Sequence, residues 1–108
     1  MIRFCKKLFL TEKTERDLEK IRQKLYTGAG MTGIIFIELA SNKKDVFDLI
    51  PAAMFKQKSF RSRDHFIIGI AENRRKCNDL VKDIVLEHFE ATGSYENLRK
   101  DIEDRIVG

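Results

Sequence analysis

The chain is short of the residues on which many function classes depend. Its 108 residues include one proline, two cysteines, two histidines and no tryptophan. No apolar run approaches the roughly 20 residues of a membrane-spanning helix, so we expect no membrane contact. The basic amino-terminal residues also lack the apolar stretch of a secretory signal peptide, and we expect a cytoplasmic protein.

The cysteines and histidines are too scattered for the usual metal and redox sites. Cys5 and Cys77 form no C-x-x-C pair, so we expect two buried free thiols. His65 and His88 have no partner at metal-ligand spacing, and we expect His88 to pack at the boundary of an apolar stripe. We therefore predict no metal site and no cofactor.

Catalytic motifs are also missing, because no G-x-S-x-G turn follows an expected strand. Glu38 and Glu72 lie near expected strand ends and could act as acid–base groups. Carboxylates are common there, so we assign no catalytic residue and favour a binding role over an enzyme. A cleft that places either carboxylate beside a histidine would revive the enzyme hypothesis.

Apolar residues make up 43% of the chain and charged residues 35%, which fits a single folded domain over residues 1–108. The net charge is +4, a mild excess that permits an anionic partner without requiring one.

Residues 64–93 carry the clearest pattern in the chain. Residues 66–71 are an apolar run typical of a strand buried on both faces. Asn73 can then cap a helix that Gly93 would end. The helix would present one apolar stripe, made of Cys77, Leu80, Val81, Ile84, Val85 and Phe89.

The remaining pattern predicts strands over residues 2–10 and 33–39, separated by a helix that Gly28 ends. Residues 42–50 resemble a short helix stopped by Pro51, and Ser94 could cap a last helix. We leave residues 52–63 unassigned.

This order, β-α-β-(α)-β-α-α, predicts an α/β fold with a small, mostly parallel sheet of about three strands flanked by helices. The first two strands should be parallel, with a right-handed crossover. The alternative is an α+β sandwich of ferredoxin-like type, in which residues 52–63 would supply a further strand. The open edges of so small a sheet make a homodimer plausible.

Residues 28–33 match G-x-G-x-x-G, but in the wrong structural order. A dinucleotide-binding loop follows a strand and opens a helix, whereas this segment follows a helix and opens a strand. We interpret it as a helix stop followed by a loop.

Two groups of basic residues are candidate binding sites. The first group alternates with Phe55, Phe60 and Phe66 and could contact nucleic acid, although a solvated loop is the simpler interpretation. It comprises Lys56, Lys58, Arg61 and Arg63.

The second group follows the expected strands and opens helices whose amides favour anions. If the sheet is parallel, residues 11–14, 41–44 and 72–76 share one edge. The anion-binding candidates there are Lys43, Lys44, Asn73, Arg74, Arg75 and Lys76.

The block Ile68-Gly69-Ile70-Ala71, the Leu80-Val81 helix and the later Phe89-x-x-Thr92-Gly93-x-Tyr95 resemble a family of small uncharacterised bacterial proteins. The segment Leu49-Ile50-Pro51-Ala52 extends the resemblance, which covers about two-thirds of the chain. The family has no assigned function, so the resemblance implies no functional residues.

The sequence thus favours a small binding or regulatory module for an anionic, for example phosphorylated, ligand or for nucleic acid. The alternative is a structural subunit that associates with itself and has no catalytic activity.

Overall fold

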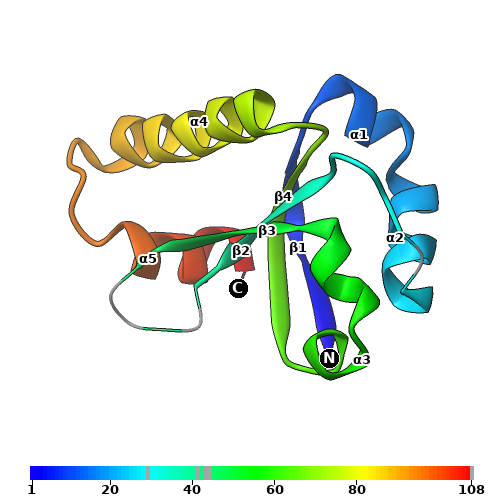
Figure 1. The fold of residues 1–108 in the computed structure, drawn as a ribbon. Coiled ribbons are helices and arrows are strands. Elements are labelled where there is room, and N and C mark those ends of the chain that lie inside the picture. Colours follow the sequence, from blue (N-terminus) through cyan, green and yellow to red (C-terminus); the bar gives the residue numbers. More distant parts are fainter. Residues whose placement is uncertain (29, 41, 43–44, 108) are drawn as a thin grey trace.

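A computed structural model describes residues 1–28, 30–40, 42 and 45–107. The chain forms one mixed sheet with helices on both faces (Figure 1). The strands are β1 (Ile2–Leu10), β2 (Ile35–Leu39), β3 (Phe47–Pro51) and β4 (His65–Ala71). The α-helices are α1 (Glu12–Arg16), α2 (Leu18–Thr27), α3 (Lys58–Arg61), α4 (Arg74–Thr92) and α5 (Leu98–Asp101). A 3₁₀-helix, η1 (Ala52–Lys56), and a π-helix, η2 (Ile102–Val107), complete the fold.

The sheet is mixed, so the predicted mostly parallel sheet is wrong. Its four strands lie in the order β1-β4-β2-β3. Only β1 and β4 are parallel, whereas β2 runs antiparallel to both β4 and β3. The first two strands of the chain are therefore antiparallel to each other and are separated by β4, contrary to the expected parallel pair.

The short helix predicted over residues 42–50 is wrong, and this error has the largest consequence for the fold. Residues 47–51 instead form β3, which makes a hairpin with β2. The Asn42 side chain accepts from the Asp45 amide at 2.8 Å, and the Ala40 amide donates to Val46 O at 2.9 Å. An Asn side chain that accepts from a nearby amide serves a turn as well as a helix start. The ferredoxin-like alternative is not supported either, because residues 52–63 form η1 and α3 and not a strand.

The central strand–helix unit is confirmed. β4 leads directly to Asn73, whose side chain accepts from the Lys76 amide at 2.8 Å and so caps α4. Gly93 ends α4 with a φ of 74°, a left-handed conformation that glycine adopts without steric cost. The last helix begins later than expected, at Leu98, because the Ser94 hydroxyl accepts from the Glu96 amide within the preceding turn.

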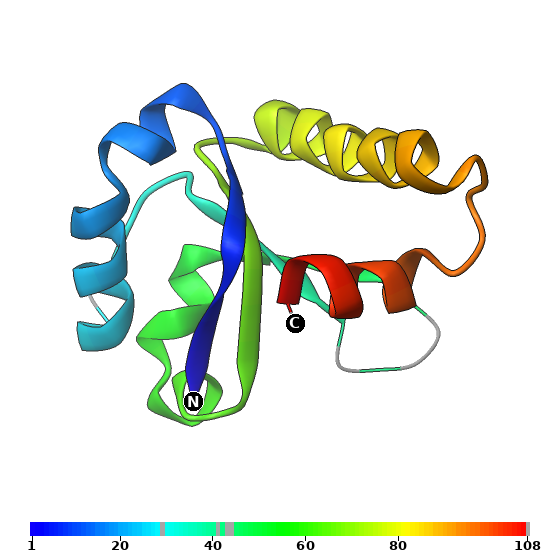
Figure 2. The same cartoon turned by 180° about the vertical axis from the view of Figure 1, so that it is seen from behind.

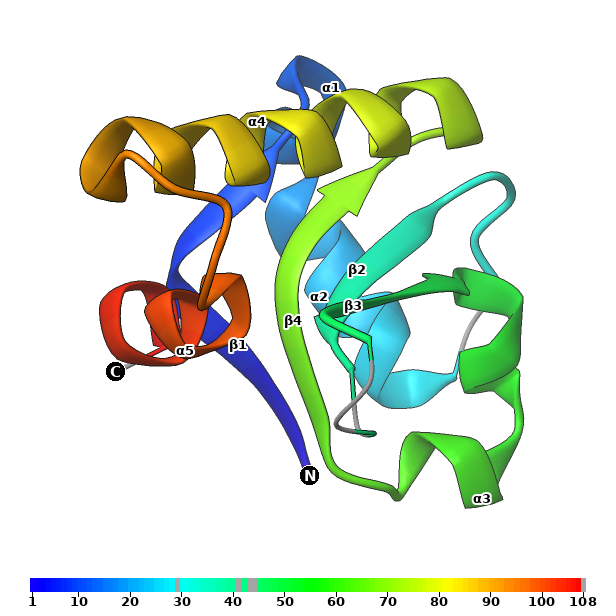
Figure 3. The same cartoon turned by 90° about the vertical axis from the view of Figure 1, so that its left-hand side faces the viewer.

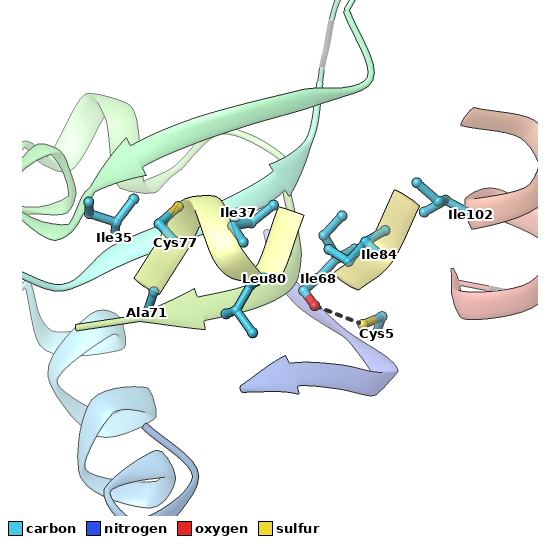
Figure 4. Close-up of a cluster of buried hydrophobic side chains, with 9 residues drawn as sticks. All are labelled: Cys5, Ile35, Ile37, Ile68, Ala71, Cys77, Leu80, Ile84 and Ile102. Carbon is cyan, nitrogen blue, oxygen red and sulfur yellow. Dashed lines mark hydrogen bonds between the residues drawn. The ribbon is translucent and has the colours of Figure 1, made fainter. Parts of the chain in front are cut away.

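Helices lie on both sides of the sheet, as the views from opposite sides show (Figures 1 and 2), and each face of the sheet is covered by an apolar layer. On one face, α4 and the carboxyl-terminal helices cover a cluster in which Leu80, Ile84 and Ile102 meet Ile68 (Figure 4). On the other face, α2 and η1 cover a second cluster. Its buried members are Ile21, Leu25, Phe36, Ala52, Phe55, Ile67 and Ile70.

Both cysteines are free and buried, as predicted. Burial raises the pKa of the Cys5 thiol to about 11 and also raises the pKa of Cys77. Neither thiol is therefore suited to act as a nucleophile near neutral pH. In the described part of the chain, no helix combines the length and apolar character needed to cross a bilayer.

Candidate functional site

A cavity of about 770 Å³ opens beside the first turn of α4. Three segments far apart in the sequence form its walls. They are residues 30–35 before and into β2, residues 51–53 at the start of η1 with Lys56 at its end, and Asn73 with Arg74 at the start of α4. Figure 3 shows the start of α4 and the loop before β2 at the same end of the sheet. The cavity thus joins a mainly apolar floor to two basic side chains.

Backbone contacts hold these walls together. The Ala52 amide donates to Ile34 O at 2.9 Å, which ties η1 to the loop before β2. Gly33 has a φ of 82°, and a Cβ there would lie 3.0 Å from Glu72 O, so the same loop presses against the turn that precedes α4. A larger residue at position 33 would be strained and would also meet that carbonyl. Glycine is required at this wall of the cavity.

The first turn of α4 has an unusual charge distribution. It contains Arg74, Arg75 and Lys76 and no acidic residue. The amino end of a helix carries partial positive charge, so each cation there costs about 0.3–1 kcal/mol of folding free energy when no anion is present. The backbone amides of Arg74 and Arg75 open the helix and have no acceptor within it. Amides and cations together form a place where an anion would be stabilised.

Cations outnumber carboxylates in the lining of the cavity and of two smaller depressions. One of these depressions runs along α1 and α2 and shares residues 30–32 and Ile34 with the cavity, and the other lies between α1 and the start of α4. The lining of the three contains seven cations and three carboxylates. The cations are Lys13, Arg16, Lys20, Lys24, Lys56, Arg74 and Lys76.

The predicted anion-binding residues are only partly brought together. Arg74 and Asn73 line the cavity, whereas Lys76 lines the neighbouring depression and Arg75 is exposed. The expected meeting of residues 11–14 with residues 72–76 is present, because the Thr11 hydroxyl donates to Glu72 Oε2 at 3.2 Å.

The strand that leads to the third expected segment ends elsewhere. β2 runs antiparallel to β4, so its carboxyl end at Leu39 leaves from the opposite end of the sheet. Lys43 and Lys44 themselves lie outside the described residues.

The four residues predicted to contact nucleic acid are divided among different environments. Lys56 lines the cavity beside Gly30. Arg61 donates to Phe55 O at 2.8 Å and packs against Gly28, which makes it a structural contact at the end of α2. Lys58 and Arg63 are exposed on α3 and just after it.

The aromatic residues beside them are occupied by packing. Phe55 is 1% exposed and packs edge-to-face on Phe36 and Phe60, and the Arg3 guanidinium lies over the Phe66 ring. These rings do not form a shared exposed surface on which nucleic-acid bases could stack.

The sequence did not predict that residues 30–34 line the cavity. The order helix, loop, strand was predicted correctly, and with it the rejection of a dinucleotide fingerprint. The loop nevertheless borders the amino end of a helix, α4, which comes 40 residues later in the chain. The hint was the spacing of Gly28, Gly30 and Gly33, which allows close backbone approach.

A carboxylate does lie beside a histidine, as the enzyme hypothesis required. His65 Nδ1 is 2.9 Å from Glu38 Oε1, and both residues line a depression of about 350 Å³ at the far end of the sheet. However, His65 Nε2 lies 2.7 Å from Phe60 O. Both ring nitrogens are engaged within the protein, so this arrangement leaves neither for a substrate.

His88 is more buried than predicted, at 1% exposure. Its Nδ1 is 2.7 Å from Asp101 Oδ2 and its Nε2 is 2.8 Å from Glu96 O. The residue links α4 to the segment that leads into α5, and it is not a boundary residue. Among the described residues, no group of three or more His, Cys, Asp or Glu side chains is placed to hold a metal ion.

Comparison of the chain with protein-family models, with curated proteins and with solved structures finds no match. The function must therefore be inferred from the site itself.

Proposed function

We propose that this domain binds a small anionic ligand in the cavity at the start of α4. The observation that carries the proposal is the first turn of α4, where three cations and no acid stand at the positive end of a 19-residue helix. This arrangement lowers stability unless a negative charge is bound. The adjoining cavity, with Lys56 on its opposite wall, gives that charge a place to bind.

The lining favours an anion that carries an apolar group. Met31, Ile34, Pro51 and Ala52 border the cavity beside the basic start of α4. A phosphate or carboxylate would contact the helix amides and Arg74, while the rest of the ligand would cover the apolar wall. A small ligand is favoured over nucleic acid because Phe55 is buried and gives no stacking surface.

Arg74→Glu is expected to weaken binding of phenyl phosphate about tenfold or more, because a hydrogen bond to a charged group is worth about 1.5–3 kcal/mol. Isothermal titration calorimetry at fixed ionic strength measures the loss. Lys82→Glu is the matched control, since Lys82 is exposed on the same helix and the charge change is identical. Lys82 lies about 12 Å further along the helix, and its variant should retain the affinity.

Equal weakening by both variants would mean that net charge alone attracts the ligand, and it would contradict a site at Arg74. Salt-sensitive binding of single-stranded oligonucleotides, with no binding of phenyl phosphate, would favour nucleic acid instead.

Self-association is the second candidate, and it depends on β3. β3 pairs with β2 along one side and forms an edge of the sheet, with Phe47, Leu49 and Ile50 half-buried. An open apolar edge strand can pair with the same strand of a second copy. Sedimentation velocity at micromolar concentrations should then show a dimer that Leu49→Pro disrupts. A single monomeric species across the concentration range would rule this out.

A further inference from the structure

The pair His65–Glu38 must hold a proton. Phe60 O can only accept a hydrogen bond, so the Nε2 atom that lies 2.7 Å away carries a hydrogen. The Glu38 carboxylate lies 2.9 Å and 3.1 Å from Nδ1, which requires another hydrogen between these groups. Both hydrogen bonds, between Glu38 and His65 and between His65 and Phe60, can form only when the pair is protonated. The protonated pair carries one proton more than a neutral imidazole beside an ionised carboxylate.

Loss of that proton breaks one of the two links. The remaining ring hydrogen would stay on Nδ1, because the buried negative charge of Glu38 needs a donor. The lone pair of Nε2 would then face Phe60 O at a distance under 3 Å. Glu38 and His65 belong to the inner strands β2 and β4, whereas Phe60 belongs to α3, a four-residue helix without a side-chain cap. We therefore expect α3 to move away from His65 when the proton is lost, while the two strands stay in place.

The surroundings of the pair affect when this proton is lost. The His65 and Glu38 side chains are 4% and 6% exposed. Burial raises the pKa of the Glu38 carboxyl; Asp48 on β3 raises it further, and His65 opposes the shift. The same depression contains Arg63 and Asp64, and the Met1 ammonium lies 3.4 Å from Asp64.

The sign of the pH effect follows from the hydrogen bonds, because the protonated pair is neutral overall and makes both links, whereas the deprotonated pair buries a net negative charge and keeps only one link. The folded protein keeps the proton over a pH range in which the unfolded chain has lost it. The stabilising contribution is therefore present at low pH and is lost as pH rises through the folded pKa.

Movement of α3 would reach the cavity through residues 52–61. Lys56 packs against Gly30, where a Cβ would lie 2.6 Å from Lys56 Cε. Arg61 connects Phe55 O to Gly28 at the end of α2. The same short segment thus carries the His65 contact at one end and a wall of the cavity at the other.

We propose that the His65–Glu38 pair is a proton-dependent lock that holds residues 52–61 in place and so regulates anion binding in the cavity. The coupling to a ligand rests on the proposed function, whereas the lock itself does not. Anion affinity should be higher at low pH, where the lock is closed.

The Glu38→Gln variant should form both hydrogen bonds without the extra proton. The glutamine amide can donate to Nδ1 while Nε2–H donates to Phe60 O, so both links form with a neutral imidazole. The variant should hold α3 at every pH. Asp48→Asn is the matched control, because it removes one carboxylate from the same depression and leaves Glu38 and His65 in contact.

Hydrogen exchange of the amides at Arg61, Ser62 and Arg63 reports the lock directly, because all three donate within this segment. Between about pH 6 and pH 9, after correction for intrinsic exchange rates, their protection should fall about fivefold, the loss of one ordinary hydrogen bond. The fall should persist in Asp48→Asn, moved to lower pH because the Asp48 charge no longer raises the pKa of the Glu38 carboxyl, and it should be absent in Glu38→Gln. Constant protection in the wild-type protein, or an equal fall in Glu38→Gln, would overturn the lock.

Titration with phenyl sulfate tests the coupling, since the charge of this anion is constant over the same pH range. Affinity should fall about fivefold from about pH 6 to pH 9 in the wild-type protein and stay constant in Glu38→Gln. Falling protection with constant affinity would overturn the coupling. Falling protection with no binding at any pH would disprove the anion site while supporting the lock.

Discussion

Leu80→Asp is expected to abolish cooperative folding. Leu80 is 7% exposed and packs between α4 and the sheet in the cluster that contains Ile68 and Ile84 (Figure 4). The lost burial costs about 1.5–3 kcal/mol, and an unpaired carboxylate in that layer adds several more. A domain of this size has about 5–15 kcal/mol of stability in total. Thermal melting followed by circular dichroism should show no cooperative transition.

The control for this result lies on the same helix. Leu86 is 51% exposed, so Leu86→Asp should change the free energy of unfolding by no more than about 0.5 kcal/mol. A Leu80→Asp variant that melts cooperatively near the wild-type temperature would mean that α4 buries a different face.

Phe55→Ala should remove about 3–5 kcal/mol of the free energy of unfolding. Phe55 is 1% exposed, and its ring lies 5.3 Å from Phe36, 5.2 Å from Phe60 and 4.8 Å from His65. It therefore fixes η1 and α3 to the sheet on the face opposite α4. Urea denaturation measures the loss.

Its neighbour supplies the comparison. Met54 is 38% exposed, so Met54→Ala should cost well under half as much in the same urea experiment. If Phe55→Ala costs no more than Met54→Ala, residues 52–61 are not anchored as described, and the wall of the cavity is not rigid.

The strand–helix unit could be predicted because local and tertiary preferences agree there. Asn73 and Gly93 mark the helix ends chemically, and the stripe through Leu80 and Ile84 has helical spacing. The apolar run from Phe66 to Ala71 is buried by α4 on one face and by η1 and α2 on the other. Each of these signals can be recognised without knowledge of the rest of the chain.

The topology could not be predicted because one strand was mistaken for a helix and the pairings of the others join segments far apart in the sequence. Phe47 and Leu49 face one layer while Ile50 faces the other, which is the alternation of a strand. Over five residues this pattern competes with an apparent helix cap at Asn42 and a helix stop at Pro51. β3 pairs with β2 as a hairpin, while β4 pairs parallel to β1 and antiparallel to β2 and so lies between them.

In the candidate site, too, local features could be predicted from the sequence and long-range contacts could not. The cations at Arg74–Lys76 were found from the sequence because they lie at a predicted helix start. Their partnership with Lys56 and the loop at Gly33 was not found, because it depends on the antiparallel course of β2. The basic start of the helix could be predicted from the sequence. The contacts between distant segments that form the cavity could not.

The site proposed at the start of α4 should bind an anion in solution. The most direct measurement is a ¹⁵N–¹H NMR titration of the protein with phenyl phosphate. The largest chemical-shift changes should be at the amides of Arg74 and Arg75, with smaller changes at Thr32 and Gly33 on the facing wall. Saturable shifts confined to these segments would support the site. No shifts, or shifts centred on Lys58–Arg63, would contradict it.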